Sequence, residues 1–314
     1  MSPVVTVTDL SKRYRRVTAL DKVSFSLTEN RIYGLLGRNG AGKTTLMQIL
    51  TAQNFASSGE VSVFGEHPYE NERVLSRICF IKESQTYPQN LQVQHALRAA
   101  GLIYPNWDDE FAHSLVSEFQ LPLRRNVRKL SRGMLSALGI VIGLASRAPL
   151  TFFDEPYLGL DAVTRQLFYD HLLADYTQHP RTVVLSTHLI DEVADLIEHI
   201  LLIDRGRILL DESAESLRGQ IVTVAGPVPA VNEFAGTGTE LHRVGLGGTA
   251  RATVRGDFGQ AGWDRARSLG LTVEAASLQE LVVRLTTAQN GHAATETRPS
   301  AAESAADLTA KEKS

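Results

Sequence analysis

A glycine-rich segment at residues 37–45 limits what this 314-residue chain can fold into more than any other part of it. The segment fits the pattern G-x-x-x-x-G-K-[ST] and directly follows an apolar run at residues 32–36. After it, apolar residues recur at helical spacing. A strand, a glycine loop and a helix in this order form the context in which the pattern binds phosphate. The candidate nucleotide-contacting residues are Gly37, Arg38, Asn39, Gly40, Ala41, Gly42, Lys43, Thr44 and Thr45.

The expected chemistry of this segment is phosphate binding. Glycines allow successive backbone N–H groups to point into one concavity, and the N-terminus of the following helix adds a partial positive charge. In such a loop Lys43 reaches the β- and γ-phosphates of a nucleotide, and the hydroxyl of Thr44 is a ligand of Mg²⁺. The alternative is a glycine turn beside a surface lysine, and the flanking strand and helix argue against it.

The composition narrows the class of protein. Hydrophobic residues make up 43% of the chain and charged residues 21%, which is ordinary for a soluble globular protein. The net charge of −3 gives no reason to expect nucleic acid as a partner. The single cysteine, Cys79, excludes an internal disulfide, so we expect a reducing cytosol. The N-terminus lacks a signal-peptide pattern, and the most apolar window, residues 138–145, is too short to span a bilayer. We therefore expect any membrane role to depend on a separate partner.

The glycine loop and the hydrophobic pattern around it predict a nucleotide-binding domain over residues 1–217. Alternating or apolar runs predict strands on both sides of the glycine loop. Residues 90–147 change character and predict a mainly helical insert between strands of the sheet.

The rest of the chain predicts a second domain and a tail. Residues 218–288 are richer in Gly, Ala, Thr and Val and predict a small C-terminal α/β accessory domain. Within it we expect strands at 221–225 and 252–255 and helices at 263–269 and 278–285. The tail at residues 289–314 has almost no apolar side chains to bury, so we expect it to be disordered.

Polar side chains follow two apolar strands of the nucleotide-binding domain. Asp154 and Glu155 end the run at residues 150–153, where one carboxylate can hold the Mg²⁺ shell and the other can act as a general base. His188 ends the run at residues 182–185 and is placed to contact the γ-phosphate and the attacking water. Taken alone, an acidic pair before a proline is equally a helix-start feature, and a lone histidine is an ordinary polar residue.

A second candidate anion site begins at Ser131. This serine is a natural N-cap for an apolar helix, and a helix N-terminus attracts anions. One nucleotide needs only one such anion-binding helix N-terminus. A second anion-binding helix N-terminus without its own lysine has a role if two chains pair head to tail, so that each chain completes the nucleotide site of the other.

Together these motifs resemble the ATPase subunit of an ATP-binding cassette (ABC) transporter, over about residues 10–217. Residues 37–44 resemble its Walker A loop, 150–155 its Walker B strand with the catalytic glutamate, and 130–134 its LSGGQ signature. The resemblance also implies roles for single residues: Tyr14 as the adenine-stacking aromatic, Ser131 and Gly133 against the γ-phosphate, Asp161 in the D-loop and His188 as the switch histidine. A weaker match, residues 277–285, is similar to the C-terminal end of antibiotic-type exporter ATPases.

Three departures from the family pattern place the chain in a divergent branch. Arg132 replaces the first glycine of the signature, and Met134 replaces its glutamine. Tyr157 and Leu158 stand where the family often has small residues. At the Q-loop position, whose residue contacts the metal shell, alignment places Glu83, whereas Gln85 lies two residues later.

The sequence therefore predicts an α/β fold: a P-loop NTPase (RecA-like) core with an antiparallel β-subdomain, a helical signature subdomain and the small C-terminal domain. The predicted function is that of a cytoplasmic ATPase subunit, which dimerises around two Mg-ATP with a second copy or a paralogue. We expect this subunit to bind at the inner face of the membrane to a separate transmembrane permease, which it drives. The extra C-terminal domain favours export over import by analogy alone. Two alternatives remain: a soluble ABC protein without a transport role, and a nucleotide sensor with weak hydrolysis.

Overall fold

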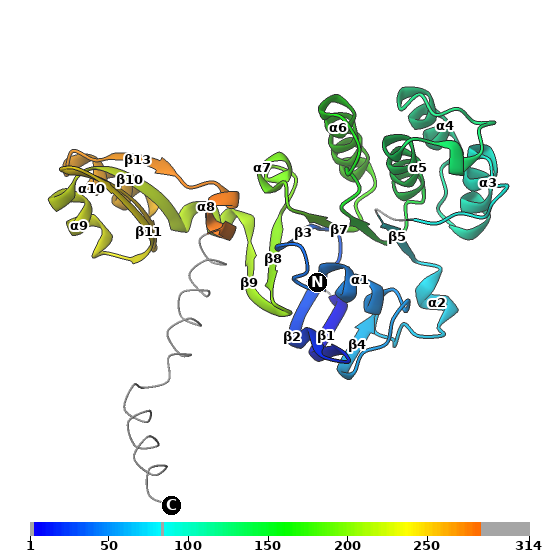
Figure 1. Cartoon of the computed structure of the whole chain (residues 1–314), viewed down its shortest axis with the longest axis horizontal. Helices are drawn as coiled ribbons and strands as arrows, with labels where there is room; N and C mark the ends of the chain where they lie inside the picture. Colours follow the sequence, from blue (N-terminus) through cyan, green and yellow to red (C-terminus); the bar gives the residue numbers. More distant parts are fainter. Residues whose placement is uncertain (1–2, 83–84, 284–314) are drawn as a thin grey trace, which may run out of the picture. The chain divides into compact units, whose positions relative to one another are not determined.

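The structure is a computed structural model that describes residues 3–82 and 85–283 (Figure 1). The chain divides into two compact units, residues 1–217 and residues 218–314. None of the described helices is both long enough and apolar enough to cross a membrane.

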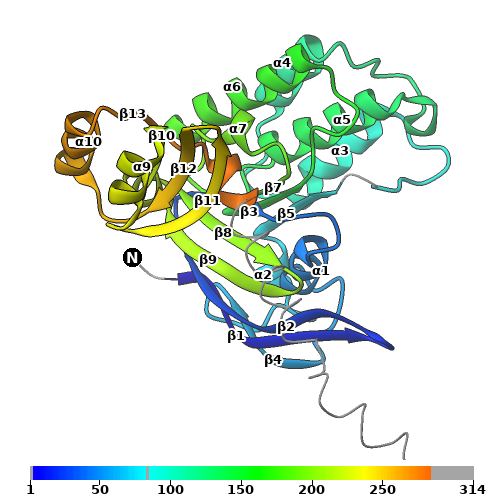
Figure 2. The same cartoon turned by 60° about the vertical axis from the view of Figure 1, so that its left-hand side comes forward.

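A six-stranded sheet forms the centre of the first unit (Figure 2). Its strand order is β5-β6-β7-β3-β8-β9. The first five of these strands run parallel, and β9 pairs antiparallel with β8. Strands β3, β6 and β7 are buried along their whole length, as expected for apolar runs covered on both faces. The strands are β3 (Ile32–Leu36), β5 (Ile78–Lys82), β6 (Leu150–Asp154), β7 (Thr182–Thr187), β8 (His199–Asp204) and β9 (Arg207–Ser213).

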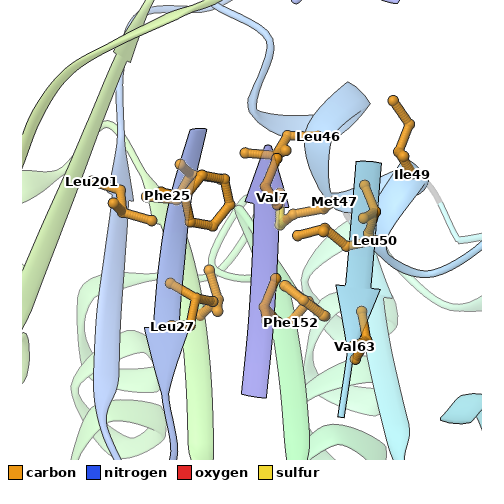
Figure 3. Packing of buried hydrophobic residues seen from close by; sticks show 14 of the residues in the cluster. Val7, Phe25, Leu27, Leu46, Met47, Ile49, Leu50, Val63, Phe152 and Leu201 are labelled. Carbon is orange, nitrogen blue, oxygen red and sulfur yellow. The ribbon is translucent and has the colours of Figure 1, made fainter. Parts of the chain in front are cut away.

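A three-stranded antiparallel sheet lies next to this core, with strand order β2-β1-β4. Its strands are β1 (Pro3–Tyr14), β2 (Val17–Thr28) and β4 (Ser58–Val63). Helix α1 (Lys43–Leu50) packs its buried face, including Leu46 and Met47, against both sheets (Figure 3). Phe25 from β2 and Phe152 from β6 belong to the same hydrophobic core. This packing fixes the first turn of α1, and therefore the glycine loop, relative to the strand ends.

The predicted helical insert contains α3 (Val93–Ile103), α4 (Asp109–Glu118) and α5 (Arg132–Ala145), which lie together in both views (Figures 1 and 2). Side-chain caps define two of the starts: Asp108 accepts a hydrogen bond from the backbone N–H of Phe111 at 2.8 Å, and Ser131 accepts one from Met134 at 3.2 Å. The C-terminal part of α5 is buried all round. Outside these three helices, the first unit contains α2 (Glu72–Leu75), the 3₁₀ turn η1 (Val127–Lys129), α6 (Ala162–Gln178), α7 (Ile190–Val193) and α8 (Ala214–Gln220). The division between the two units falls within α8.

The second unit is a four-stranded antiparallel sheet with strand order β11-β12-β10-β13. Along the chain its elements alternate as β-α-β-β-α-β, the ferredoxin-like arrangement of split βαβ units. Phe234 and Val231 of α9 pack with Val224 and Val254 of the sheet in a separate small core. The elements are β10 (Ile221–Pro227), α9 (Val228–Ala235), β11 (Thr239–Leu246), β12 (Thr249–Arg255), α10 (Gly259–Ser268) and β13 (Thr272–Ala275).

The α/β class, with its P-loop core and antiparallel β-subdomain, is confirmed. In the second unit the strands expected at 221–225 and 252–255 lie within β10 and β12, and the helix expected at 263–269 overlaps α10. The sequence analysis missed α9, which contains Pro229, β11, which contains Gly245, and β13, which is only four residues long. Residues 278–283 are helical, whereas the end of that predicted helix and the tail at 289–314 lie outside the described residues.

Candidate functional site

The predicted phosphate, acidic and histidine motifs meet at one edge of the six-stranded sheet. Strand β7 lies between β6 and β3, and all three are parallel, so their carboxyl ends lie side by side. The glycine loop follows β3, Glu155 follows β6 and His188 follows β7. These segments surround a cavity of about 570 Å³. Its lining consists of Ala19, Asn39, Gly40, Ala41, Gly42, Lys43, Thr44, Thr45, Asp154, Glu155, Leu158 and His188.

Two positions of the loop require glycine because the backbone leaves no room for a side chain. A Cβ atom at Gly37 would lie 2.2 Å from the backbone oxygen of Ile203, and one at Gly42 would lie 2.6 Å from that of Ala19. Both residues also have positive φ angles, 154° and 115°. The loop therefore packs its backbone directly against neighbouring backbone, which fixes its curvature.

The amino group of Lys43 lies inside this loop. It donates a hydrogen bond to the backbone oxygen of Gly37 at 2.8 Å, and its Nζ is 3.4 Å from Oε1 of Glu155. The two side chains are 6% and 13% exposed, so the ion pair is largely withdrawn from water. A cation held in this way is oriented before any phosphate arrives.

The carboxylate of Asp154 is buried and accepts one hydrogen bond on each oxygen. Thr44 Oγ1 donates to Oδ2 at 2.7 Å, and Ser186 Oγ donates to Oδ1 at 2.6 Å. Ser186 Oγ also lies 3.2 Å from the backbone N–H of Glu155, which donates to it. The sequence analysis gave Ser186 no role, although its position two residues before His188 at the end of β7 was a usable signal.

Glu155 has a left-handed backbone conformation, with φ 49°, that non-glycine residues rarely adopt. Such strain persists where the surroundings hold it, and it occurs often at functional sites. The turn directs Oε2 to within 2.9 Å of His188 Nδ1, while Oε1 faces Lys43. The glutamate thus joins the loop lysine to the histidine.

The comparisons with known proteins agree with this geometry. The family model for the ABC transporter matches residues 20–158. The bacitracin transport ATP-binding protein BcrA of Bacillus licheniformis is 33% identical over 218 residues, which cover 67% of this chain and 69% of that protein. The chain belongs to the ABC transporter family. It is an ATP-binding protein and ATPase of this family.

Other members of the family resemble this chain over different lengths. The Nod factor export ATP-binding protein I of Neorhizobium galegae is 28% identical over 292 residues, which cover 87% of this chain and 82% of that protein. A solved ATP-binding subunit of an ABC transporter matches the fold with a TM-score of 0.62 and 24% identity, over 68% of this chain and 92% of that chain. The ATP-binding cassette MJ0796, solved as a dimer bound to ADP and Pi, has a TM-score of 0.59 and 21% identity, over 67% of this chain and 98% of that one.

The signature and D-loop residues of this ABC protein do not line the phosphate cavity. The signature instead lies against the segment just before Asp161: a Cβ atom at Gly133 would be 2.6 Å from the backbone oxygen of Gly159. Next to this contact, Ser136 Oγ donates to the backbone oxygen of Leu158, a residue of the cavity lining, at 2.7 Å. Ser131 is the exposed N-cap of α5.

Asp161 is the exposed N-cap of α6. Its carboxylate accepts a hydrogen bond from the backbone N–H of Thr164 at 2.8 Å, and this contact lowers the pKa of Asp161. Both caps, at α5 and at α6, are therefore exposed and lie outside the lining of the chain's own glycine loop cavity.

Tyr14 does not line the cavity either. Tyr14, at the end of β1, is 43% exposed; its hydroxyl lies 2.5 Å from Asn54 Nδ2 and its ring 4.9 Å from the Lys12 amino group. It is absent from the cavity lining, and adenine stacking stays a prediction. Glu83, the predicted metal-shell residue, lies outside the described residues. Gln85, the other candidate, has a buried side-chain oxygen without a hydrogen-bond partner in the described part of the chain.

Tyr157 is a site residue that the sequence analysis noted only as a departure from the family. It is buried, and its hydroxyl lies 3.1 Å from His188 Nδ1 and 2.9 Å from Thr187 Oγ1. Burial raises the pKa of Tyr157 to about 12, and the nearby Glu155 charge adds to the effect, so the phenol keeps its proton at neutral pH.

Proposed function

We propose that this chain is the ATP-hydrolysing subunit of an ABC transporter, that it dimerises around two Mg-ATP, and that it drives a separate transmembrane permease. One observation carries the proposal: Lys43, the Thr44–Asp154 pair, Glu155 and His188 converge on a single cavity at the ends of three adjacent strands. These groups suit a bound triphosphate with its metal. Phosphoryl transfer needs positioning and charge stabilisation more than covalent chemistry from the protein.

The residues present fit a magnesium ion. The Thr44 hydroxyl and the Asp154 carboxylate are hard oxygen donors already in contact at 2.7 Å. The described residues contain no cluster of three or more acidic, histidine or cysteine side chains that would form an all-protein metal cage. That is consistent with Mg²⁺, which usually takes one or two carboxylates together with waters and substrate phosphates. When bound, the ion neutralises charge that develops on the β- and γ-phosphates.

We assign the proton-accepting role to Glu155. Its carboxylate is held at the rim of the loop by the left-handed turn and by Lys43, with Oε2 beside His188, so it is positioned to orient a water at the γ-phosphate. Lys43 binds the terminal phosphates, and His188 contacts the γ-phosphate from the end of β7. The backbone N–H groups of the loop bind the remaining phosphate oxygens.

The dimer follows from the residues left outside the cavity. Ser131 and Gly133 sit at the N-terminus of α5, which is a 14-residue helix with an anion-attracting end, yet they do not line the chain's own nucleotide cavity. In a head-to-tail pair each chain supplies this helix end, and Asp161 beside it, to the nucleotide of the other chain. The partner is a second copy or a paralogue of similar structure.

We propose export as the direction of transport. Among the relatives, BcrA is named for bacitracin transport and the Neorhizobium galegae protein for Nod factor export, and the alignment with the latter extends into the second unit. The permease partner would place the chain at the inner face of the membrane.

Purification of the full chain from its source cells tests this function. We expect a tagged chain to copurify, after detergent extraction of membranes, with an integral membrane protein that raises its ATPase rate. A matched Lys43→Ala chain should copurify with the same partner but show no ATPase activity. A chain that hydrolyses ATP yet neither associates with a membrane protein nor responds to one would contradict the transport role and leave the ATPase assignment intact.

A further inference from the structure

The Tyr157 hydroxyl lies at the centre of a hydrogen-bond chain that ends on the histidine of the site. Three polar atoms surround it: Thr187 Oγ1 at 2.9 Å, the backbone nitrogen of His188 at 3.1 Å and His188 Nδ1 at 3.1 Å. The tyrosine is only 2% exposed, so these protein groups, rather than solvent, decide where its proton lies.

The directions of these hydrogen bonds follow from which atoms carry hydrogen. The backbone N–H of His188 can only donate to the phenol. Thr187 Oγ1 accepts from the backbone N–H of Leu189 at 2.9 Å and donates to the phenol. With two donors already directed at the phenolic oxygen, the phenolic hydrogen is left to point at the remaining neighbour, His188 Nδ1. Hydrogen bonds in such a series polarise and strengthen one another.

His188 Nδ1 also lies 2.9 Å from Oε2 of Glu155, and the two neighbours make opposite demands on it. The carboxylate accepts only, so it needs a hydrogen on Nδ1. The phenol donates, so it needs a bare Nδ1. A neutral imidazole carries one hydrogen on one nitrogen, and that position follows from the partner of the other nitrogen. Tyr157 and Glu155 therefore favour opposite tautomers of His188.

We propose that Tyr157 is a positioning residue that holds His188 in the tautomer with hydrogen on Nε2, so that Nδ1 donates no hydrogen bond to the Glu155 carboxylate, although Oε2 lies 2.9 Å from it. The side chain of His188 is 42% exposed and lines the phosphate cavity, and its ring faces both Tyr157 and Glu155 through Nδ1. With Nδ1 facing Tyr157 and Glu155, this tautomer leaves Nε2 to offer an N–H donor to a phosphate oxygen. In the other tautomer Nε2 would offer a lone pair, which repels an anion.

This inference rests on the proposed role of the site in ATP hydrolysis, but its first test does not depend on activity. The full chain labelled with ¹⁵N-histidine is examined by NMR at a pH well above the usual histidine pKa of about 6.5. The chain has nine histidines, so the signals of His188 are assigned by their loss in His188→Gln. We expect Nδ1 of the unmodified chain to have the shift of a nitrogen without hydrogen. A protonated Nδ1 in the unmodified chain would overturn the proposal without any Tyr157 variant.

The second test is Tyr157→Phe, which keeps the buried ring and removes only the hydroxyl. We expect the hydrogen of His188 to move to Nδ1, and kcat for ATP hydrolysis to fall about 10- to 100-fold, the range in which partners that orient a functional histidine act. The KM for ATP should stay within about twofold, a change of about 0.4 kcal/mol, because Lys43 and the glycine loop are untouched. Tyr169→Phe is the matched control, since Tyr169 is also buried and its hydroxyl has no partner in the described residues.

A double-mutant cycle separates this role from a general effect on folding. In the His188→Gln background the added Tyr157→Phe change should alter kcat by less than about twofold, because the residue through which Tyr157 acts is gone. An equal fold loss in both backgrounds would show that Tyr157 only supports the structure and would overturn the proposal. If the parent chain hydrolyses no ATP, the proposed function fails, while the NMR result still decides the tautomer.

Discussion

Replacement of Glu155 by Gln separates nucleotide binding from hydrolysis in this site. The amide has nearly the same shape as the carboxylate, so the left-handed turn at Glu155 and the packing around it should persist. It cannot accept a proton from water. It also carries no charge, so it no longer forms an ion pair with Lys43 Nζ, which lies 3.4 Å from Oε1.

The magnitude follows from these two losses. A positioned general base contributes about 10²–10⁴-fold, which corresponds to about 3–5 kcal/mol of activation free energy. We therefore expect kcat to fall by at least about 100-fold. The Kd for ATP should stay equal or decrease, because the ion pair of Lys43 and Glu155 is nearly buried and its removal frees the lysine for phosphate.

Phosphate release measures kcat and calorimetric titration measures Kd, both on the full chain with Mg²⁺. Glu118→Gln is the matched control: Glu118 Oε2 lies 2.8 Å from His171 Nε2, so this change also removes a carboxylate from a glutamate–histidine pair, but away from the cavity. The control should hydrolyse ATP at the parent rate. Hydrolysis at the parent rate by Glu155→Gln would refute the reasoning, because another group would then be the base.

Three further predictions concern binding, assembly and the loop backbone. Lys43→Ala should abolish tight ATP binding because a cation that reaches the terminal phosphates is lost, and micromolar binding by calorimetry would contradict this. Mixing Lys43→Ala with Ser131→Arg chains should restore partial ATPase activity through heterodimers with one intact site; inactivity under conditions of proven subunit exchange would contradict the shared site. Gly37→Ala should lower the melting temperature and prevent ATP binding, since its Cβ would meet the Ile203 oxygen at 2.2 Å, whereas Gly40→Ala, with no atom within 4 Å, should lose only about 1–2 kcal/mol of stability through its positive φ of 79°.

The local sequence determined the elements whose pattern is strong. The glycine pattern at residues 37–45 between an apolar strand and an amphipathic helix left few alternatives, because only a phosphate loop needs glycines and a lysine at that spacing. Continuous apolar runs predicted the central strands β6 and β7, since strands buried on both faces must be apolar throughout. The candidate residues Asp154, Glu155 and His188 followed from these strands, because parallel strands end at the same edge of a sheet.

The second unit was less predictable from its sequence. Helix α9 begins at Val228-Pro229, and its three buried core residues, Val231, Phe234 and Ala235, span little more than one turn of a helix. Strand β11 contains a glycine and has no clear alternation. The secondary structure of α9 and β11 depends on their packing in the sheet and the small core. This tertiary effect outweighs local propensity.

Only the tertiary structure decided which atoms meet inside the site. The sequence showed Tyr157 as an unusual residue and Ser186 as an ordinary strand end, and nothing local revealed that the first contacts His188 while the second contacts Asp154. Those contacts join residues about 30 positions apart, through the pairing of β6 with β7. Hydrogen-bond geometry depends on distances of a few tenths of an ångström, and these are set by the packing of the sheet and not by the sequence of either strand alone.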